Sequence, residues 1–319
     1  MSATEISPET QTRWDADIEL PAPRQNRDVT FMHKVEAGVA KALLRLMGAQ
    51  RIDKAAARMG GFMKWFGPML RPVHARGHAN LQLVYPDMTA AERAAILRGV
   101  WENIGATTAE FAHMAELADR TRIINEDRLQ EVINSGGKAI FFSGHFANWE
   151  AMGATLHRAG LRYALVYRAA NNPLVDAEII RLRGAAMSRW QIPKNQRASR
   201  DLIKSLKENL SLCMLTDQKL NDGISSPLLG YDAMTATASA KLALREQIPL
   251  IPIQLVREPG SRFVMTVHEP LDPPESPDDQ EAAIQELTDR MNEKIGEFIL
   301  DRPDQWLWFH RRWPRDLVG

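Results

Sequence analysis

Hydrophobic positions along the chain follow two patterns: short continuous runs, and longer stretches in which apolar residues recur every three or four positions. The first pattern is typical of buried strands and the second of helices that pack one face on a core. The continuous runs are residues 139–143, 165–168, 210–217, 250–256 and 263–267. The helical stretches are residues 90–118, 172–190, 198–209, 235–247 and 279–300. Because strands alternate with helices, we predict an α/β fold with a central mixed sheet and flanking helices.

The N-terminal part of the chain differs from the rest. Residues 1–30 are polar and contain proline, so we predict a flexible tail there. Residues 31–80 carry nine Lys and Arg against only Glu36 and Asp53, with apolar residues at helical spacing between them. This pattern predicts that residues 31–84 form a basic amphipathic helical segment on an anionic membrane surface. A helix packed on the core with a basic outer face is the alternative.

Charge and motifs exclude several classes of function. Forty basic and forty acidic residues cancel over the 319 residues, so the overall charge indicates no polyanionic partner. Residues 161–200, however, hold eight Lys and Arg against Asp176 and Glu178, and clustered arginines suit phosphate groups. No nucleic-acid-binding signature occurs, so we predict no nucleic acid partner. No nucleotide-binding loop and no GxSxG serine elbow occurs either.

Cysteine content and hydropathy exclude a Cys-based metal site and a membrane-spanning helix. Cys213 is the only cysteine, which excludes an intramolecular disulfide and a Cys-based zinc site. It lies in an apolar run, where a packed thiol is expected rather than a nucleophile. No apolar stretch approaches the roughly 20 residues of a membrane-spanning helix, and no secretory signal is visible. The sequence therefore predicts a soluble or peripheral protein.

One segment combines the residue types of acid–base catalysis with a position at the end of a strand. His145 and Glu150 stand five positions apart in FFSGHFANWE (141–150), a spacing expected about once by chance in this composition. The carboxyl end of a strand is where open α/β sheets bind ligands, and Asn148 can cap the helix that follows. We therefore predict that His145 is a general base oriented by Glu150. No protein nucleophile accompanies them, so the substrate would supply its own hydroxyl; a capping His paired with a structural Glu is the alternative.

Four ordered blocks of sequence resemble the lipid A late acyltransferases, the lauroyl and myristoyl transferases of Gram-negative outer-membrane biogenesis. FFSGHFANWE is similar to the signature that contains the His and acidic residue of that family. YRAANNPLVD (167–176) resembles its YRPxNNPxxD block. The family's region with DQD, PFFG and T-x-T is similar to TDQK (216–219), SPLLG (226–230) and TAT (235–237). Its PEQYLWxHRR ending is similar to PDQWLWFHRR (303–312). Residues 85–319 are accordingly expected to form the acyltransferase domain.

The resemblance implies transfer of an acyl chain from acyl carrier protein to a hydroxyl of a lipid A precursor at the cytoplasmic face of the inner membrane. It implies a fold like that of the glycerolipid acyltransferases, no cofactor and no metal. His145 and Glu150 would be catalytic. The substrate-binding residues would be Arg168, Asn171, Asn172, Asp176, Asp217, Gln218, Arg311 and Arg312. Arg168 would stabilise either a substrate phosphate or the charge that develops on the thioester carbonyl.

Two alternatives remain open at the level of sequence. In the first, the enzyme acts on another glycolipid or a phospholipid, with acyl-CoA or acyl carrier protein as donor. In the second, the chain is a non-catalytic lipid-binding relative. The sequence also departs from the family pattern, since Lys219 replaces the second acid of DQD. Many family members begin with a hydrophobic anchor, and the charged, amphipathic segment found here favours peripheral attachment. Arg311 and Arg312 would alternatively tie the C-terminus to the body of the protein.

Overall fold

The computed structural model describes residues 14–15, 28–194, 197–275 and 278–318. Its first half contains α1 (Phe31–Gly48), α2 (Ile52–Phe66), η1 (Gly67–Met69), α3 (Arg71–Val84), α4 (Ala90–Glu110), η2 (Phe111–His113), α5 (Met114–Leu117), β1 (Thr121–Ile124), α6 (Glu126–Asn134), β2 (Ile140–Ser143) and α7 (Trp149–Arg158). The second half contains β3 (Tyr163–Tyr167), α8 (Pro173–Ala186), β4 (Gln191–Pro193), α9 (Ala198–Lys207), β5 (Ser211–Leu215), β6 (Lys219–Leu228), β7 (Tyr231–Thr235), α10 (Ala238–Glu246), β8 (Leu250–Glu258), β9 (Arg262–Val267), α11 (Gln280–Asp301), η3 (Pro303–Gln305) and α12 (Arg315–Val318).

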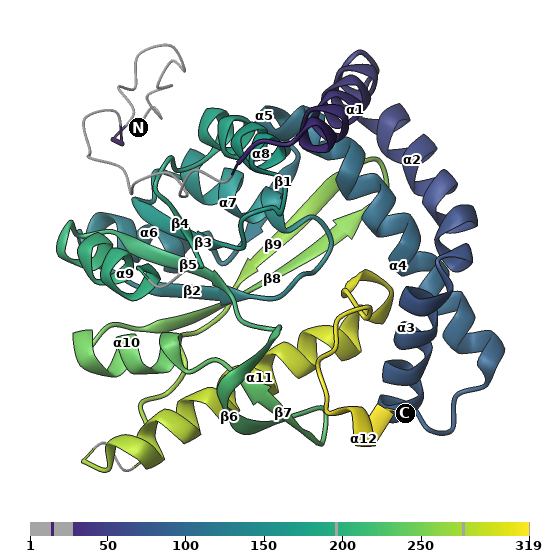
Figure 1. Ribbon diagram of the computed structural model, residues 1–319. Helices are drawn as coiled ribbons and strands as arrows, with labels where there is room; N and C mark the ends of the chain where they lie inside the picture. Colours follow the sequence, from purple (N-terminus) through teal and green to yellow (C-terminus); the bar gives the residue numbers. More distant parts are fainter. Residues whose placement is uncertain (1–13, 16–27, 195–196, 276–277, 319) are drawn as a thin grey trace.

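Seven strands form a central sheet in the order β1-β9-β8-β2-β5-β3-β4. All neighbours pair in parallel except β8 and β9, which form an antiparallel hairpin, so the predicted mixed sheet with flanking helices is confirmed. The strands β6 and β7 form a separate antiparallel hairpin that packs on α11 (Figure 1).

The sheet carries a hydrophobic core on each face because side chains alternate along every strand. Ile140 and Phe142 of β2 pack in one core with α10, α11 and the C-terminal tryptophans. Phe141 of the same strand packs in the other core with residues of α5, α6 and α7. Both faces of the central strands are therefore buried, which explains why these strands read as continuous apolar runs.

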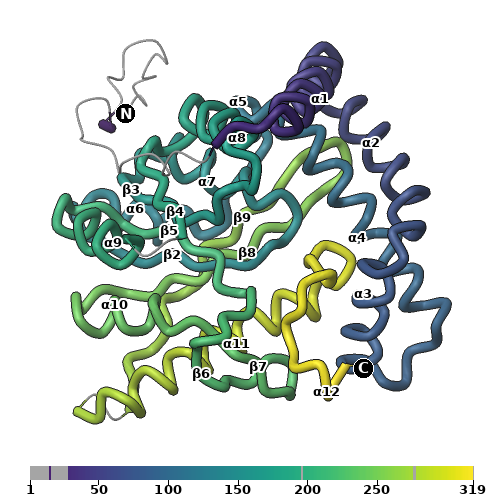
Figure 2. The backbone as a smooth tube through the Cα atoms, viewed as in Figure 1, coloured from purple at the N-terminus to yellow at the C-terminus, as the bar shows by residue number. Residues whose placement is uncertain are grey.

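Helices α1, α2 and α3 follow one another along one side of the molecule, outside the long helix α4 (Figure 1). Helix α2 packs closely on α4 because glycines lie at the crossing. A Cβ atom added at Gly105 would lie 2.4 Å from the carbonyl oxygen of Met59, and one at Gly60 would lie 3.0 Å from that of Glu102. The C-terminal helix α12 lies against α3, at the opposite end of this helical side from α1 (Figure 2).

The outer surface of this helical side is apolar as well as basic. Its exposed hydrophobic residues are Phe31, Met32, Val35, Val39, Leu43, Leu46, Phe62, Trp65, Met69 and Leu70. Within the described residues, no helix is both long enough and apolar enough to cross a membrane. Most of the expected tail at 1–30 lies outside the described residues, although the carboxylate of Asp15 accepts a hydrogen bond from the backbone N–H of Arg189.

Candidate active site

Polar side chains gather at the carboxyl ends of four neighbouring parallel strands. His145 lies two residues after β2 and Asp217 two residues after β5, while Arg168 and Lys194 directly follow β3 and β4. Because β2, β5, β3 and β4 are adjacent in the sheet, their carboxyl ends meet at one edge. Residues that are up to 72 positions apart in sequence are thereby brought together, as expected for an open α/β sheet.

The imidazole of His145 is held by the carboxylate of Asp217. Nδ1 of His145 lies 2.8 Å from Oδ1 of Asp217, and the backbone N–H of His145 donates to Oδ2 at 2.8 Å. The indole N–H of Trp306 donates to the same Oδ2, also at 2.8 Å. With the Nδ1 proton donated to the carboxylate, Nε2 carries the lone pair and can accept a proton, so the pair has the geometry of a general base and its orienting acid.

Asp217 is ionised even though it is 3% exposed. Burial by itself raises the pKa of a carboxyl group. The charge of His145, the two hydrogen bonds from His145 and the hydrogen bond from Trp306 outweigh burial, and together they hold the pKa of Asp217 well below its usual range. A carboxylate that stays charged in a dry site stabilises the imidazolium that forms when His145 takes up a proton.

Glu150 lies elsewhere than predicted. It begins α7 after the N-cap Asn148, and its carboxylate turns toward α8, where Arg183 donates to both oxygens at 2.8 and 2.5 Å. No hydrogen bond joins Glu150 to His145 among the described residues. The prediction that Glu150 folds back onto the imidazole is therefore wrong: a buried carboxylate requires a close partner, and Arg183 supplies a bidentate one.

The turn that carries His145 is fixed by hydrogen bonds to its backbone. Ala147 adopts φ 47°, a left-handed conformation that is unfavourable for a residue with a Cβ atom. Its carbonyl accepts from Asn103 at 2.9 Å and from Thr107 at 3.1 Å, and its N–H donates to the carbonyl of Gln305 at 2.9 Å. Helix α4 and the C-terminal segment thus hold the strained turn in place from two sides.

A cavity of about 200 Å³ opens at the exposed edge of His145. Its apolar wall comprises Met152, Leu165, Val166, Cys213 and Leu215, and its polar residues are His145, Glu150, Arg168, Arg183, Lys194, Gln218 and His310. The amide nitrogen of Gln218 lies 3.4 Å from Nε2 of His145, next to the atom that would act as base. Burial raises the pKa of the Cys213 thiol, which agrees with a packing role for this side chain.

Two cations stand side by side at this cavity. Strands β3 and β4 pair Tyr167 with Pro193, so the next residues, Arg168 and Lys194, leave the sheet together. Partial burial and the positive charge of Arg168 lower the pKa of Lys194, although the negative charge of Asp217 acts to raise it. Neither Arg168 nor Lys194 forms an ion pair within the part of the chain that the structure describes. The pair is therefore suited to an external anion.

Two residues predicted to bind substrate, Asn172 and Asp176, have structural partners instead. Asn172 caps α8 through Leu174 N–H at 2.9 Å and donates to the carbonyl of His33 on α1 at 2.9 Å. Asp176 is buried and accepts from the N–H of Ala170. These two side chains shape the loop after β3 and join it to α1, which explains their place in the NNPxxD block.

Arg312 is also internal, with 0% of its surface exposed. It donates to the carbonyl of Met234 at 2.9 Å and to the hydroxyl of Thr235 at 2.8 Å, and thereby fastens the C-terminus to β7. Burial lowers the pKa of Arg312 to about 10, although the negative charge of Asp217 acts to raise it. The predicted substrate contact of Arg312 is wrong, and its alternative, a tie to the body, is confirmed. Arg311 and Asn171 are exposed and do not line the cavity.

Comparison with known proteins decides the family. The sequence profile of the bacterial lipid A biosynthesis acyltransferases matches residues 29–315. The chain belongs to this family. It is 24% identical over 246 residues to the lipid A biosynthesis lauroyltransferase of Escherichia coli K12, covering 74% of this chain and 77% of the relative. It is 26% identical over 269 residues to the lipid A biosynthesis myristoyltransferase of the same organism, covering 80% and 79%.

A protein of Haemophilus influenzae named lipid A biosynthesis acyltransferase is 22% identical over 268 residues, which cover 80% of this chain and 79% of the relative. The family and the names of these relatives establish that the chain is an acyltransferase of lipid A biosynthesis. The resemblance noted in the four sequence blocks is thereby confirmed.

Several residues of the candidate site escaped the sequence analysis. Trp306 contacts Asp217 from the C-terminal segment, and Arg183 neutralises Glu150 from α8. Lys194 and His310 line the cavity. The C-terminal block contained the signal for Trp306 and His310, since PDQWLWFHRR is one of the four matching blocks. Trp306, Trp308 and Trp313 are all buried, so they belong to the core.

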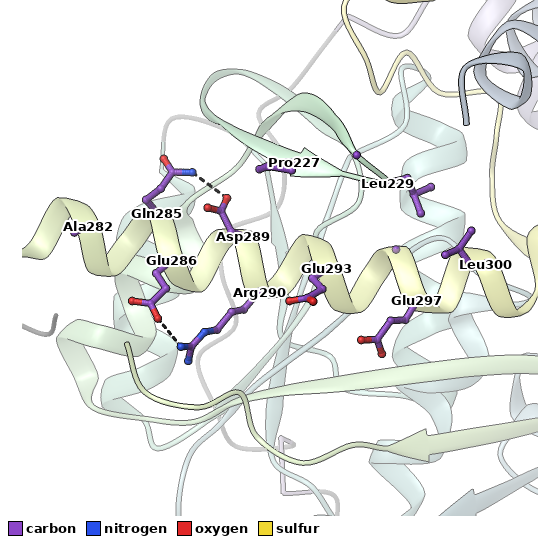
Figure 3. Close-up of a pocket in the computed structure, with 12 residues that line it drawn as sticks. Pro227, Leu229, Ala282, Gln285, Glu286, Asp289, Arg290, Glu293, Glu297 and Leu300 are labelled. Atoms are coloured by element: carbon purple, nitrogen blue, oxygen red, sulfur yellow. Dashed lines mark hydrogen bonds and ion pairs between the residues drawn. The ribbon is translucent and has the colours of Figure 1, made fainter. Parts of the chain in front are cut away.

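A larger cavity of about 720 Å³ lies away from this site, along α11 and the β6–β7 hairpin. Figure 3 shows Glu286, Asp289, Glu293 and Glu297 on the turns of α11 that face it. It shares no residue with the cavity at His145. Within the described residues, no group of three or more His, Cys, Asp or Glu side chains is placed to hold a metal ion.

Proposed function

We propose that this acyltransferase moves a fatty acyl chain from acyl carrier protein to a hydroxyl of a phosphorylated lipid A precursor at the cytoplasmic face of the inner membrane. The observation that carries the proposal is the His145–Asp217 pair, which faces a cavity with an apolar wall and two cations that form no ion pair with any described residue. The relatives named lauroyltransferase and myristoyltransferase support a fatty acyl group. The arrangement is also compatible with the glycerolipid acyltransferase fold, which we propose as the nearest architecture.

The proposed reaction is a direct transfer. Nε2 of His145 takes the proton of the acceptor hydroxyl while the hydroxyl oxygen attacks the thioester carbonyl carbon. The tetrahedral intermediate collapses, the carbon–sulfur bond breaks, and the thiolate takes the proton back from the imidazolium. The new ester and the free thiol balance the reaction without a cofactor or metal. Asp217 keeps Nδ1 protonated and stabilises the transient positive charge.

Different residues around the His145–Asp217 pair would bind the two substrates. Arg168 and Lys194 would bind a phosphate of the acceptor, because a guanidinium and an ammonium at one opening match a doubly charged anion. Met152, Leu165 and Leu215 would hold the first carbons of the acyl chain. The alternative role of Arg168, at the thioester carbonyl, is less favoured because Arg168 is exposed at the opening.

The exposed face of α1 and α2 would bring the enzyme to its lipid substrate. Ten large hydrophobic side chains are exposed on α1, α2 and the turn that follows, among basic residues. Such a surface matches the interface of an anionic membrane, where apolar groups enter the headgroup layer and cations meet the phosphates. Asn172 joins α1 to the loop that carries Arg168, so the site and the membrane-facing helices form one unit.

The test is an acyl-transfer assay with purified wild type and His145→Ala. Acyl carrier protein loaded with C12, C14 or longer chains is mixed with a tetraacylated lipid A precursor, and products are weighed by mass spectrometry. One added acyl chain in the wild type alone supports the proposal. Product formed only with another glycolipid, a phospholipid or acyl-CoA would replace the acceptor or donor. An equally active His145→Ala enzyme would refute the assigned base, and lipid binding without any transfer would favour a non-catalytic relative.

A further inference from the structure

A second histidine faces the cavity at His145. His310 follows η3 in the C-terminal segment and lines the same cavity. Its backbone is fixed by Asn80 of α3, whose amide donates to the carbonyl of Trp308 at 2.7 Å and to that of His310 at 2.9 Å. The backbone that carries the ring is therefore held against α3.

The imidazole of His310 has hydrogen-bonding capacity that the protein leaves unused. Nδ1 is buried without a hydrogen-bond partner, and Nε2 has none among the described residues. A proton on Nδ1 would bury an N–H group that has no acceptor, which is costly. The favoured neutral tautomer therefore carries its proton on Nε2.

The environment also keeps this ring uncharged. Burial lowers the pKa of His310 to about 4, although the negative charge of Asp217 acts to raise it. The positive charges of His145 and Arg312 act in the same direction as burial. A neutral ring is useful here, because a second imidazolium beside His145 would oppose proton uptake by the base.

We propose that the Nε2–H of His310 points into the cavity and donates a hydrogen bond to the oxygen of the tetrahedral intermediate. This inference rests on the proposed acyl transfer. During the attack the thioester carbonyl gains negative charge on oxygen, and a fixed donor in a dry site stabilises that charge more than it stabilises the ground state. His145 and His310 thus divide the work: the first moves the proton and the second, neutral and fixed, stabilises the oxyanion.

The experiment compares His310→Phe, His310→Gln and His310→Asn in the complete enzyme, with the same acyl carrier protein thioester and lipid A precursor. Gln places an amide N–H near the position of Nε2, whereas Asn places one near Nδ1. Loss of one oxyanion donor costs about 10²–10³-fold in kcat. We expect this loss for His310→Phe and His310→Asn with KM for both substrates within about threefold, and a recovery of at least about tenfold for His310→Gln. His268→Gln, which alters another half-buried histidine outside the cavity, should stay within about twofold of wild type.

Each outcome decides the question. A kcat for His310→Phe within threefold of wild type, or equal activities of the Gln and Asn variants, overturns the role. If the Phe variant does not fold, the Gln-to-Asn ratio alone decides, and melting temperatures show whether both are folded. If wild type transfers no acyl chain to any acceptor, the proposed function fails and the role of His310 fails with it. Wild-type transfer without a Gln-to-Asn difference rejects only His310.

Discussion

The imidazole of His145 is held by side chains that are distant in sequence. Asp217 and Trp306 belong to different segments from His145, yet both contribute to the hydrogen bonds that set the tautomer and charge of the pair. Glu150, the acid of the local motif, instead pairs with Arg183 and forms a wall of the cavity. The position at a strand end therefore singled out His145, whereas Asp217, the carboxylate that holds its imidazole, was assigned to substrate binding.

Asp217→Asn tests the orienting role at nearly constant side-chain volume. Asn does not supply the negative charge and can donate toward Nδ1, so Nε2 is protonated in the wrong tautomer. By analogy with orienting aspartates in catalytic triads, kcat should fall by roughly 10³–10⁴-fold with a smaller change in KM. Steady-state transfer kinetics measure it, and circular dichroism checks that the fold is kept. A variant with nearly normal kcat would contradict the assignment.

Glu150→Gln tests a structural contribution of the motif acid. The change leaves the guanidinium of Arg183, 12% exposed, without its counter-charge. Removing one partner of a buried ion pair costs about 3–5 kcal/mol, and we expect a loss of unfolding free energy at the lower end of that range. Urea denaturation measures it. Glu178→Gln on α8, the helix that carries Arg183, is the matched control, because its partner Arg181 is 64% exposed, and it should destabilise much less.

At the scale of elements, the hydrophobic pattern located the five central strands and most of the long helices, but it did not find α6 or four of the strands. Strand β4 has three residues, β1 contains Thr121 and Arg122, and β6 carries polar residues, Gly223 and Pro227. β1 and β4 are the edge strands of the central sheet, β6 and β7 form the outer hairpin, and each is short or interrupted by polar residues. Their sequences therefore have no continuous apolar run to find.

The exposed face of α1 and α2 predicts that binding to anionic vesicles depends on its aromatic residues. In the double variant Phe62→Ser/Trp65→Ser, two side chains that are 48% and 64% exposed no longer enter the headgroup layer. The partition coefficient to vesicles containing phosphatidylglycerol should fall about tenfold or more, equivalent to about 1.4 kcal/mol. Co-sedimentation measures it. Leu300→Ser on α11, at a position 53% exposed, should bind like wild type; equal loss in both would refute this surface.

For the whole molecule, the neutral state of His310 couples stability to pH. Its pKa is about 4 in the folded protein and 6.5 when unfolded. Between these values the unfolded chain binds more protons, so this contribution is complete above pH 6.5 and is lost as pH falls toward 4. The residues whose charges act on the ring are Asp217, His145, Arg312 and Arg76.

Wild type and His310→Gln should therefore diverge in acid. Between pH 7 and pH 4.5 the variant should lose about 1–2 kcal/mol less unfolding free energy than wild type, after allowance for the solvent that reaches the ring. Urea denaturation at the two pH values gives both losses, and effects of carboxylates common to the two proteins cancel in the difference. Identical pH dependence would show that His310 is not held neutral by the fold.

The sequence by itself determined the α/β class, most elements with strong periodicity and the family, and it singled out His145, because each depends on local pattern or ordered motifs. Only the tertiary structure decided that Asp217 orients the imidazole, that Arg183 neutralises Glu150, and that Asn172 and Arg312 are structural. The physical reason is that partners of buried charges are chosen by distance in space. The order of β2, β5, β3 and β4 in the sheet sets those distances, and no local spacing encodes that order.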